Sequence, residues 1–275
     1  MPLRFPAIQI FLNDGHGGLN ALPPLNLEGV SEIDQIAIAD FNGDGVADLL
    51  VGDEAANGSS VVLLLAQAPA VFGPPSTIPR IGWPGAVTMA VFLVADLNQD
   101  GLPDIVANTT DAQLAILLNQ GDGGFESTLY PTPALSQWIT IPRVGAAPDI
   151  AFSLLPHNFD SHGLQLLINS GTGAFSAGPV YQVNASWLAI ADFNGDCIPD
   201  IAADVGSWCP NGTTSSVSVL YGDGDGGFDA PVSLPVTEHD ASGMASLGSV
   251  GNPRAFAVAD ACGIGVTVYG DPTVT

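Results

Sequence analysis

Three segments of the sequence place short carboxylate and amide side chains at every second residue. Residues 39–48 read ADFNGDGVAD, residues 95–104 read ADLNQDGLPD, and residues 191–200 read ADFNGDCIPD. Oxygen ligands spaced in this way around a tight turn suit a hard cation, and Ca²⁺ fits them best. We therefore predict about three Ca²⁺ ions, one per loop, with the carbonyl of the seventh loop residue completing each set. The predicted ligands are Asp40, Asn42, Asp44, Val46 and Asp48; Asp96, Asn98, Asp100, Leu102 and Asp104; and Asp192, Asn194, Asp196, Ile198 and Asp200.

Two other kinds of loop resemble these segments. An EF-hand requires Glu at the twelfth loop position and a helix on either side. The twelfth residues here are Val51, Ala107 and Ala203, and the flanking sequences are strand-like. The alternative is a metal-free turn built on Asn and Asp side chains. Because three aspartates that converge without a cation repel one another, we expect the metal to be bound.

The segments that position these loops are short and apolar, which predicts β-strands on both sides of each loop. A second phrase recurs between the loops: an apolar strand, a Gly-rich turn, and an aromatic residue or Leu that opens another strand. Its copies begin at residues 10, 63, 116, 166, 219 and 266. One repeat is therefore strand, metal loop, strand, variable loop, strand, Gly-rich turn, strand. Four short antiparallel strands in about 50 residues are typical of a β-propeller blade.

We predict an all-β fold, a β-propeller of four-stranded antiparallel blades in a single domain over residues 1–275. It has about five repeats and an N-terminal half-repeat. The repeated segment that supplies the third strand of each blade occurs at both ends of the chain. Either one copy is displaced, or the chain is part of a larger ring. The predicted bounds are 1–30 for the hairpin half-blade and about 31–83, 84–134, 135–184, 185–240 and 241–275 for the repeats.

Two of the five repeats have lost the metal ligands. In the third repeat Pro142, Val144 and Ala146 stand where ligands belong, although Asp149 is kept at the ninth position. The fifth repeat, around residues 246–260, has no carboxylate in its loop. We expect the metal loops to mark the phase of the repeat and to stabilise the ring.

The charge balance excludes several classes of partner. The chain has 4 Arg, no Lys and 28 acidic residues, for a formal net charge of −24. Nucleic acids and anionic membrane surfaces are bound by basic patches, which this composition cannot build, so we expect no nucleic-acid partner. The sequence contains no apolar stretch of about 18 residues, so we expect no direct membrane insertion.

A family resemblance is carried by two sequence motifs. They are ADFNGDGxxD at residues 39–48, with near copies at 95–104 and 191–200, and the turn GDGGFDAP at 224–231. They resemble the FG-GAP and VCBS repeats of integrin α-subunit propellers, some fungal lectins and secreted bacterial adhesion proteins. Gln99 and Cys197 depart from the pattern, since Gly is usual at both positions. The resemblance implies a calcium-stabilised recognition or adhesion module that is secreted or displayed at the cell surface.

The resemblance leaves the ligand open, because the family includes adhesins, lectins and non-catalytic domains of large enzymes. A module for protein–protein interaction or assembly is the leading hypothesis; a carbohydrate-binding lectin is the second, and a non-catalytic domain of a larger secreted enzyme is the third. We expect a protein or glycan ligand at the strand ends opposite the metal loops, where Trp83 and Trp208 are candidates to stack on a sugar. The nucleophile motifs G-x-S-x-G and S-x-x-K are absent from any strand–turn–helix context, so we expect no enzyme activity.

Three cysteines are too few for a disulfide scaffold. A strand of about five residues, or roughly 16 Å, separates Cys197 from Cys209. The Cα atoms of a disulfide lie only about 5.5 Å apart. Cys209 and Cys262 follow equivalent strands of successive repeats, so they are the pair that we expect if a disulfide forms.

Overall fold

The computed structural model shows a chain whose regular secondary structure, in the described residues, consists of β-strands. Contacts divide the chain into two compact units: Met1–Val94 with Gly101–Tyr130, and Ala95–Asp100 with Pro131–Thr275. The assignment of residues 1–275 to one domain stays a prediction. No helix in the described part of the chain is long and apolar enough to cross a membrane. The structure describes residues 6–53, 60–78, 92–109, 112–133, 136, 138–143, 146–154, 163–183, 185, 187–204, 216–235, 241–249, 252–260 and 266–270.

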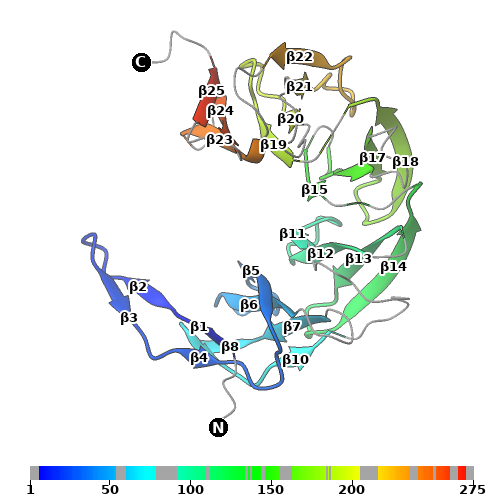
Figure 1. The fold of residues 1–275 in the computed structure, drawn as a ribbon. Coiled ribbons are helices and arrows are strands. Elements are labelled where there is room, and N and C mark those ends of the chain that lie inside the picture. Colours follow the sequence, from blue (N-terminus) through cyan, green and yellow to red (C-terminus); the bar gives the residue numbers. More distant parts are fainter. Residues whose placement is uncertain are drawn as a thin grey trace. The chain divides into compact units, whose positions relative to one another are not determined.

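Four-stranded antiparallel sheets recur along the chain, and we call them blades 1 to 4 in chain order (Figure 1). Blades 1 and 2 have most or all of their residues in the first unit. Blade 1 consists of β5 (Ile33–Ala39), β6 (Asp48–Asp53), β7 (Ser60–Leu64) and β10 (Ser76–Thr77), with the hairpin β8 (Ala66–Ala68) and β9 (Val71–Phe72) between the last two. Blade 2 consists of β11 (Phe92–Ala95), β12 (Asp104–Asn108), β13 (Gln113–Asn119) and β14 (Phe125–Pro131).

The second unit holds blades 3 and 4 and a three-stranded sheet. Each blade runs in simple order from its first to its fourth strand, as predicted. Blade 3 consists of β15 (Ile139–Thr140), β16 (Ile150–Leu154), β17 (Gly163–Asn169) and β18 (Phe175–Tyr181), and blade 4 of β19 (Trp187–Ala191), β20 (Asp200–Asp204), β21 (Ser216–Leu220) and β22 (Val232–Pro235). The last sheet consists of β23 (Ala241–Ser249), β24 (Asn252–Asp260) and β25 (Val266–Gly270).

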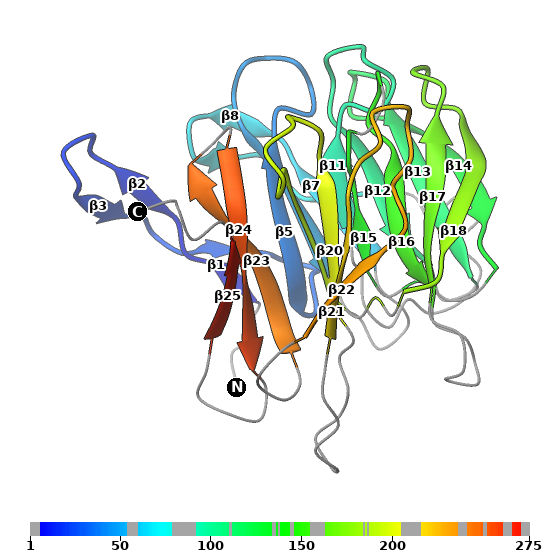
Figure 2. The ribbon, with the colours of Figure 1, turned by 90° about the horizontal axis from the view of Figure 1, so that it is seen from above.

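The N-terminal segment forms a two-stranded ribbon. β1 (Ala7–Ile8) pairs with β4 (Leu25–Asn26), and β2 (Phe11–Asn13) pairs with β3 (Leu19–Ala21). Figure 1 and Figure 2 both show the β2–β3 hairpin projecting away from β5–β7 of blade 1. The ribbon carries the same sequence phrase as the third and fourth strands of a blade, so we call it the half-blade.

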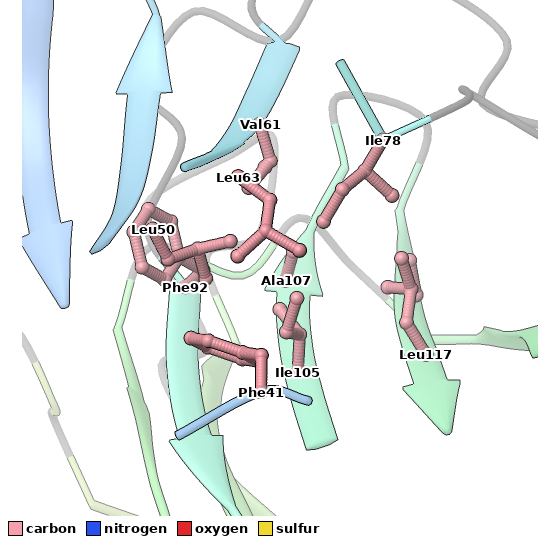
Figure 3. Close-up of a cluster of buried hydrophobic side chains, with 10 residues drawn as sticks. Phe41, Leu50, Val61, Leu63, Ile78, Phe92, Ile105, Ala107 and Leu117 are labelled. Atoms are coloured by element: carbon pink, nitrogen blue, oxygen red, sulfur yellow. The ribbon is translucent and has the colours of Figure 1, made fainter. Parts of the chain in front are cut away.

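The middle strands of each blade are largely apolar because both of their faces are covered. All five residues of β12 and of β16 are buried, whereas the outer strand β14 largely alternates between half-buried and exposed residues. Between blades 1 and 2, Leu50 and Leu63 pack with Ile105 and Leu117 in one core cluster (Figure 3). Burial of several such branched side chains contributes about 1.5–3 kcal/mol each.

Aromatic residues at the start of the fourth strand, or a few residues before it, pack in these inter-blade clusters. Phe125 meets Phe41 edge-on at a centroid distance of 6.3 Å, and Phe228 meets Tyr181 at 5.9 Å. Phe41 and Tyr181 belong to the preceding blade in each case. Phe125 and Phe228 therefore pack between blades, while Phe175 is half-buried on β18.

An asparagine at the end of the third strand ties neighbouring blades together. The side-chain nitrogen of Asn119 donates to the carbonyl oxygens of Phe41, in the loop of blade 1, and of Pro103, at 2.8 and 3.1 Å. Asn169 repeats this pattern with the carbonyls of Leu97 and Pro148, both at 2.8 Å. Each asparagine also accepts the amide of the Gly two residues later, at 2.9 Å. The link fixes a blade to the second residue of the preceding loop.

We expect Asn119→Ala to destabilise the protein by about 2–3 kcal/mol, because it leaves buried carbonyl groups without a donor. Urea unfolding monitored by fluorescence measures the change. Asn13→Ala is the matched control: Asn13 occupies the same position of the phrase in the half-blade, where it is exposed, and its loss should change stability by less than about 0.5 kcal/mol. Equal effects of the two variants would contradict the inter-blade role.

Candidate functional site

The three Asp-rich loops connect the first strand of a blade to its second strand. They follow β5 in blade 1, β11 in blade 2 and β19 in blade 4. The apolar strands fix both ends of each loop, and the polar residues between them form turns and bends in place of further strand. The predicted strand–loop–strand arrangement is therefore present in all three repeats.

The first loop turns its polar side chains toward its own backbone amides. The carboxylate of Asp40 accepts hydrogen bonds from the amides of Asp44 and Gly45, at 3.1 and 2.7 Å. The amide of Asp44 also donates to Oδ1 of Asn42 at 3.1 Å, and the amide of Val46 donates to Oδ1 of Asp44 at 2.8 Å. These Asx-type bonds gather the oxygen atoms of three side chains around the turn.

The same bonds recur in the other two loops. The amide of Asp100 donates to Oδ1 of Asp96 and of Asn98, both at 3.1 Å. The amide of Asp196 donates to Oδ1 of Asp192 and of Asn194, at 3.1 and 2.9 Å. In every loop the Asn side chain also donates to Oδ2 of the following Asp, at 2.8–3.0 Å. Because the same hydrogen bonds recur in three loops, the spacing of the Asp and Asn residues determines the loop conformation.

The fourth and sixth residues of each loop adopt the left-handed backbone conformation. Gly43 and Gly45 have φ of 72° and 84°, which glycine reaches without strain. Gln99 has φ of 62° and Cys197 has φ of 70°, so these departures from the usual Gly keep the same turn. A side chain in this conformation costs about 1–2 kcal/mol, which the loop hydrogen bonds and the flanking strands offset.

The ninth loop residue is buried, in contrast to the other acidic loop residues. The carboxylate of Asp48 is fully buried and accepts two backbone amides. They belong to Phe41, at 2.8 Å, and to Ala66, two residues after the end of β7, at 2.7 Å. Asp200 binds the amides of Phe193 and Gly222 in the same way, at 2.7 and 2.9 Å. This aspartate therefore joins the start of the loop to the end of the third strand.

The ligand-free third repeat keeps this bond. Oδ1 of the buried Asp149 accepts the amide of Asn169 at 2.9 Å, just as Oδ1 of Asp104 accepts the amide of Asn119 at 2.8 Å. The sequence pattern predicts metal binding alone for the ninth aspartates. The retention of Asp149 in a repeat without other ligands was the signal that this position has a second, structural role.

Burial raises the pKa of Asp200, while hydrogen bonds from the amides of Gly222, Phe193 and Asn194 act in the opposite direction. The negative charge of Asp196 adds to the rise. Ionisation of this carboxyl group therefore carries a cost that a nearby cation would reduce.

We expect Asp149→Ala to destabilise the protein by about 2 kcal/mol because the buried amide of Asn169 loses its acceptor. The loss should be the same in millimolar Ca²⁺ and in excess EGTA, since this repeat lacks the other ligands. Asp149→Asn, which retains an acceptor oxygen, should cost less. Thermal unfolding of the variants measures these changes, and a calcium-dependent effect of Asp149→Ala would contradict the purely structural role.

The donor chemistry of the loops fits Ca²⁺, although their carboxylates are not gathered into a ready site. In the described residues, no group of three or more His, Cys, Asp or Glu side chains is placed to hold a metal ion. The reason in the first loop is that Asp48 turns inward to backbone amides. Each carboxylate oxygen has more than one acceptor position, so these bonds leave room for ligation. The metal roles of the loop residues, including the carbonyls of Val46, Leu102 and Ile198, stay predictions.

Several predicted residues lie outside the described part of the chain. They are the candidate ligand contacts Trp83 and Trp208 and the candidate disulfide partners Cys209 and Cys262. Cys197, within the third Asp-rich loop, is an exposed free thiol.

A pair of stacked tryptophans was not predicted. The rings of Trp138 and Trp187 have centroids 4.1 Å apart and planes inclined by 35°. Both residues are half-buried and lie at the starts of the first strands of blades 3 and 4, at the ends opposite the loops. A tryptophan before or at the start of the first strand in two successive repeats was the available signal.

Comparison with known proteins supports the family resemblance. The sequence model of the FG-GAP-like repeat matches residues 5–51 and 96–147. No curated protein matches the sequence. The crystal structure of BBS1N in complex with ARL6DN, soaked with lead, is similar in fold: the TM-score is 0.60 and the identity 12%, over 94% of this chain and 72% of that chain. A structure of the same complex soaked with mercury has a TM-score of 0.49 and 16% identity, over 88% of this chain and 79% of that chain.

The four-stranded antiparallel sheets and the similarity to BBS1N define the fold as a β-propeller. Two segments of the chain match the FG-GAP-like repeat, and the predicted ligand positions of the first two Asp-rich loops lie within them. Both the predicted fold class and the predicted resemblance are confirmed.

Proposed function

We propose that this chain is a non-catalytic interaction module, stabilised by Ca²⁺ and located outside the cell or at its surface, that binds a protein partner. The observation that carries the calcium proposal is the common hydrogen-bond pattern of the three loops. In each one the first, third and fifth residues hold their oxygen atoms around the turn. Ca²⁺ prefers such sets of hard oxygen ligands.

Bound ions would act on stability and would not switch the conformation. Calcium sites of extracellular modules have dissociation constants of about 10⁻⁴–10⁻³ M, so they fill at extracellular calcium levels. Each loop already holds its conformation through its own amides. The ion would neutralise part of the negative charge of each loop, which favours the folded chain.

The surface charge supports a partner that presents basic groups. The chain has 28 acidic residues and 4 arginines, and even three bound Ca²⁺ ions would bring the net charge only from −24 to −18. An excess of negative charge attracts a basic partner and speeds its association at low salt. The similar propeller BBS1N was crystallised with a protein, ARL6DN, which supports a protein partner by analogy of fold.

We expect millimolar Ca²⁺ to raise the free energy of unfolding by about 0.4–1.4 kcal/mol per occupied site, relative to protein in excess EGTA. Calorimetry and thermal unfolding measure the stoichiometry and the shift. Asp44→Ala should remove one binding event and about a third of the shift. Asp225→Ala, at an exposed position of a hairpin turn, is the control and should change neither. A melting temperature independent of calcium would contradict the proposal.

A glycan array in the presence of Ca²⁺ separates the protein-interaction proposal from the lectin alternative. We expect no reproducible saccharide binding. Saccharide binding that Trp83→Ala or Trp208→Ala abolishes would overturn the proposed protein partner and establish a lectin.

A further inference from the structure

The side chain of Asn119 bonds to two of the Asp-rich loops at once. Its nitrogen donates to the carbonyl oxygen of Phe41 at 2.8 Å and to that of Pro103 at 3.1 Å. Phe41 lies between the first and third residues of the blade 1 loop, and Pro103 lies between the seventh and ninth residues of the blade 2 loop. All four of these neighbours are predicted calcium ligands. Both hydrogen bonds therefore hold peptide groups that adjoin ligand positions.

The remaining polar groups of Asn119 are also bonded. Its amide donates to Oδ1 of Asp104 at 2.8 Å, and its Oδ1 accepts the amide of Gly121 at 2.9 Å. The residue is only 1% exposed, so water does not replace a lost partner. A shift of the Phe41 carbonyl therefore changes the geometry of the bond to Pro103, because the same nitrogen atom makes both bonds.

Leu102, the seventh residue of the blade 2 loop, makes a second contact between the two loops. Its methyl groups lie over Gly43, in the blade 1 loop, and over Gly121, in the hairpin turn of blade 2. A Cβ atom at these glycines would stand 3.6 and 3.1 Å from them. The residue whose carbonyl is a predicted ligand in one loop thus packs against the other loop. All of these residues belong to the first unit.

The loop of blade 4 is not linked in this way. Gly222 stands at the position of Asn119, and its amide donates to Oδ1 of Asp200 at 2.9 Å, but it has no side chain to bond a loop. In the sheet that follows blade 4, Gly270 occupies the equivalent position of the repeated segment. Asn169 has the side chain, but it joins the blade 2 loop to the loop of blade 3, which lacks the metal ligands.

We propose that the predicted calcium sites of blades 1 and 2 are a coupled pair that fills cooperatively through Asn119, whereas the site of blade 4 fills independently. This inference rests on the proposed binding of calcium. Ligation in blade 1 fixes the peptide group of Phe41, because the residues on both sides of it are ligands. Asn119 is the positioning residue that extends this order to Pro103, so that ligation in blade 2 meets a smaller entropic cost.

The charge of the loops acts in the opposite direction and is reduced by salt. Each loop carries three aspartates, so one Ca²⁺ changes its charge from −3 to −1. A filled loop therefore attracts an ion to its neighbour less strongly than an empty loop does. Asp44 and Asp100 are exposed, and the Debye length is about 8 Å at physiological ionic strength. The cooperativity should consequently increase as salt is added.

Calorimetric titration with Ca²⁺ of variants that keep one or two sites tests the coupling. Asp196→Ala keeps the sites of blades 1 and 2, and a further Asp44→Ala or Asp100→Ala leaves a single site. The product of the two affinities in the Asp196→Ala variant should exceed the product of the two single-site affinities by about fivefold. Asp44→Ala alone keeps the sites of blades 2 and 4; it is the matched control and should show no excess.

The same coupling affects stability. Independent sites of equal affinity would each supply a third of the stabilisation by calcium. A coupled pair makes the loss on Asp44→Ala larger than the loss on Asp196→Ala, because the first substitution also weakens the site of blade 2. Thermal unfolding in millimolar Ca²⁺ and in excess EGTA measures both losses.

Substitution of the linking residue tests its role. Asn119→Ala, added to the Asp196→Ala variant and to its single-site derivatives, should abolish the fivefold excess, and Leu102→Ala should reduce it. Asn169→Ala is the matched control, because it removes an equivalent inter-blade bond that reaches only one predicted site, and it should keep the excess. Far-ultraviolet circular dichroism in EGTA checks that each variant is folded. The comparison of two-site and single-site variants tests the coupling even if Asn119→Ala does not fold.

The outcomes separate this inference from the proposed function. Binding of Ca²⁺ at the sites of blades 1 and 2 with no excess would overturn the coupling and leave the proposed calcium binding intact. A chain that binds no Ca²⁺ would overturn both. An excess that persists in folded Asn119→Ala protein would overturn the role of Asn119.

Discussion

The structure depends on a buried carboxylate at the end of each loop, where the second strand of the blade begins. Asp48, Asp104, Asp149 and Asp200 lie within the blades, and each accepts an amide from a backbone position at or just beyond the end of the third strand. A buried charge without partners would cost several kcal/mol, so these amides are a condition of folding. The hydrogen bond between this carboxylate and the amide holds the second and third strands in one register. In blades 2 and 3 the amide belongs to the asparagine that also contacts the preceding blade. In blades 2 and 3 the register of the strands and the contact between blades therefore both depend on one aspartate in each repeat.

Much of the fold could be predicted from the sequence because the same pattern of strands and loops recurs several times along the chain. Apolar runs on both sides of ADFNGDGVAD predicted two strands, and the Gly-rich phrase predicted the other two. The phase of the phrase also identified the N-terminal ribbon as half of a blade. Side-chain spacing in the loops predicted which oxygen atoms gather at the turn, since Asp and Asn at alternate positions bond to the amides that follow them.

What the sequence could not supply was burial and long-range partnership. Asp48 and Asp44 are the same residue type in the same loop, yet one is fully buried and the other exposed. Asn119 reads as an ordinary turn residue, but its partner Phe41 lies 78 positions earlier. The stacking of Trp138 on Trp187 likewise joins two repeats. Local propensity contains none of this information, because such contacts exist only when the blades have packed.

The direction of the asparagine links has a consequence for biosynthesis. Asn119 reaches back to Phe41, and Asn169 reaches back to Leu97, 72 positions earlier. The acceptor carbonyl is therefore always made before its donor as the chain leaves the ribosome. Each asparagine link can therefore form as soon as the later blade is made, because its acceptor in the earlier loop is already present. Repeat proteins propagate structure between nearest neighbours, and the asparagine links join neighbouring repeats of this kind.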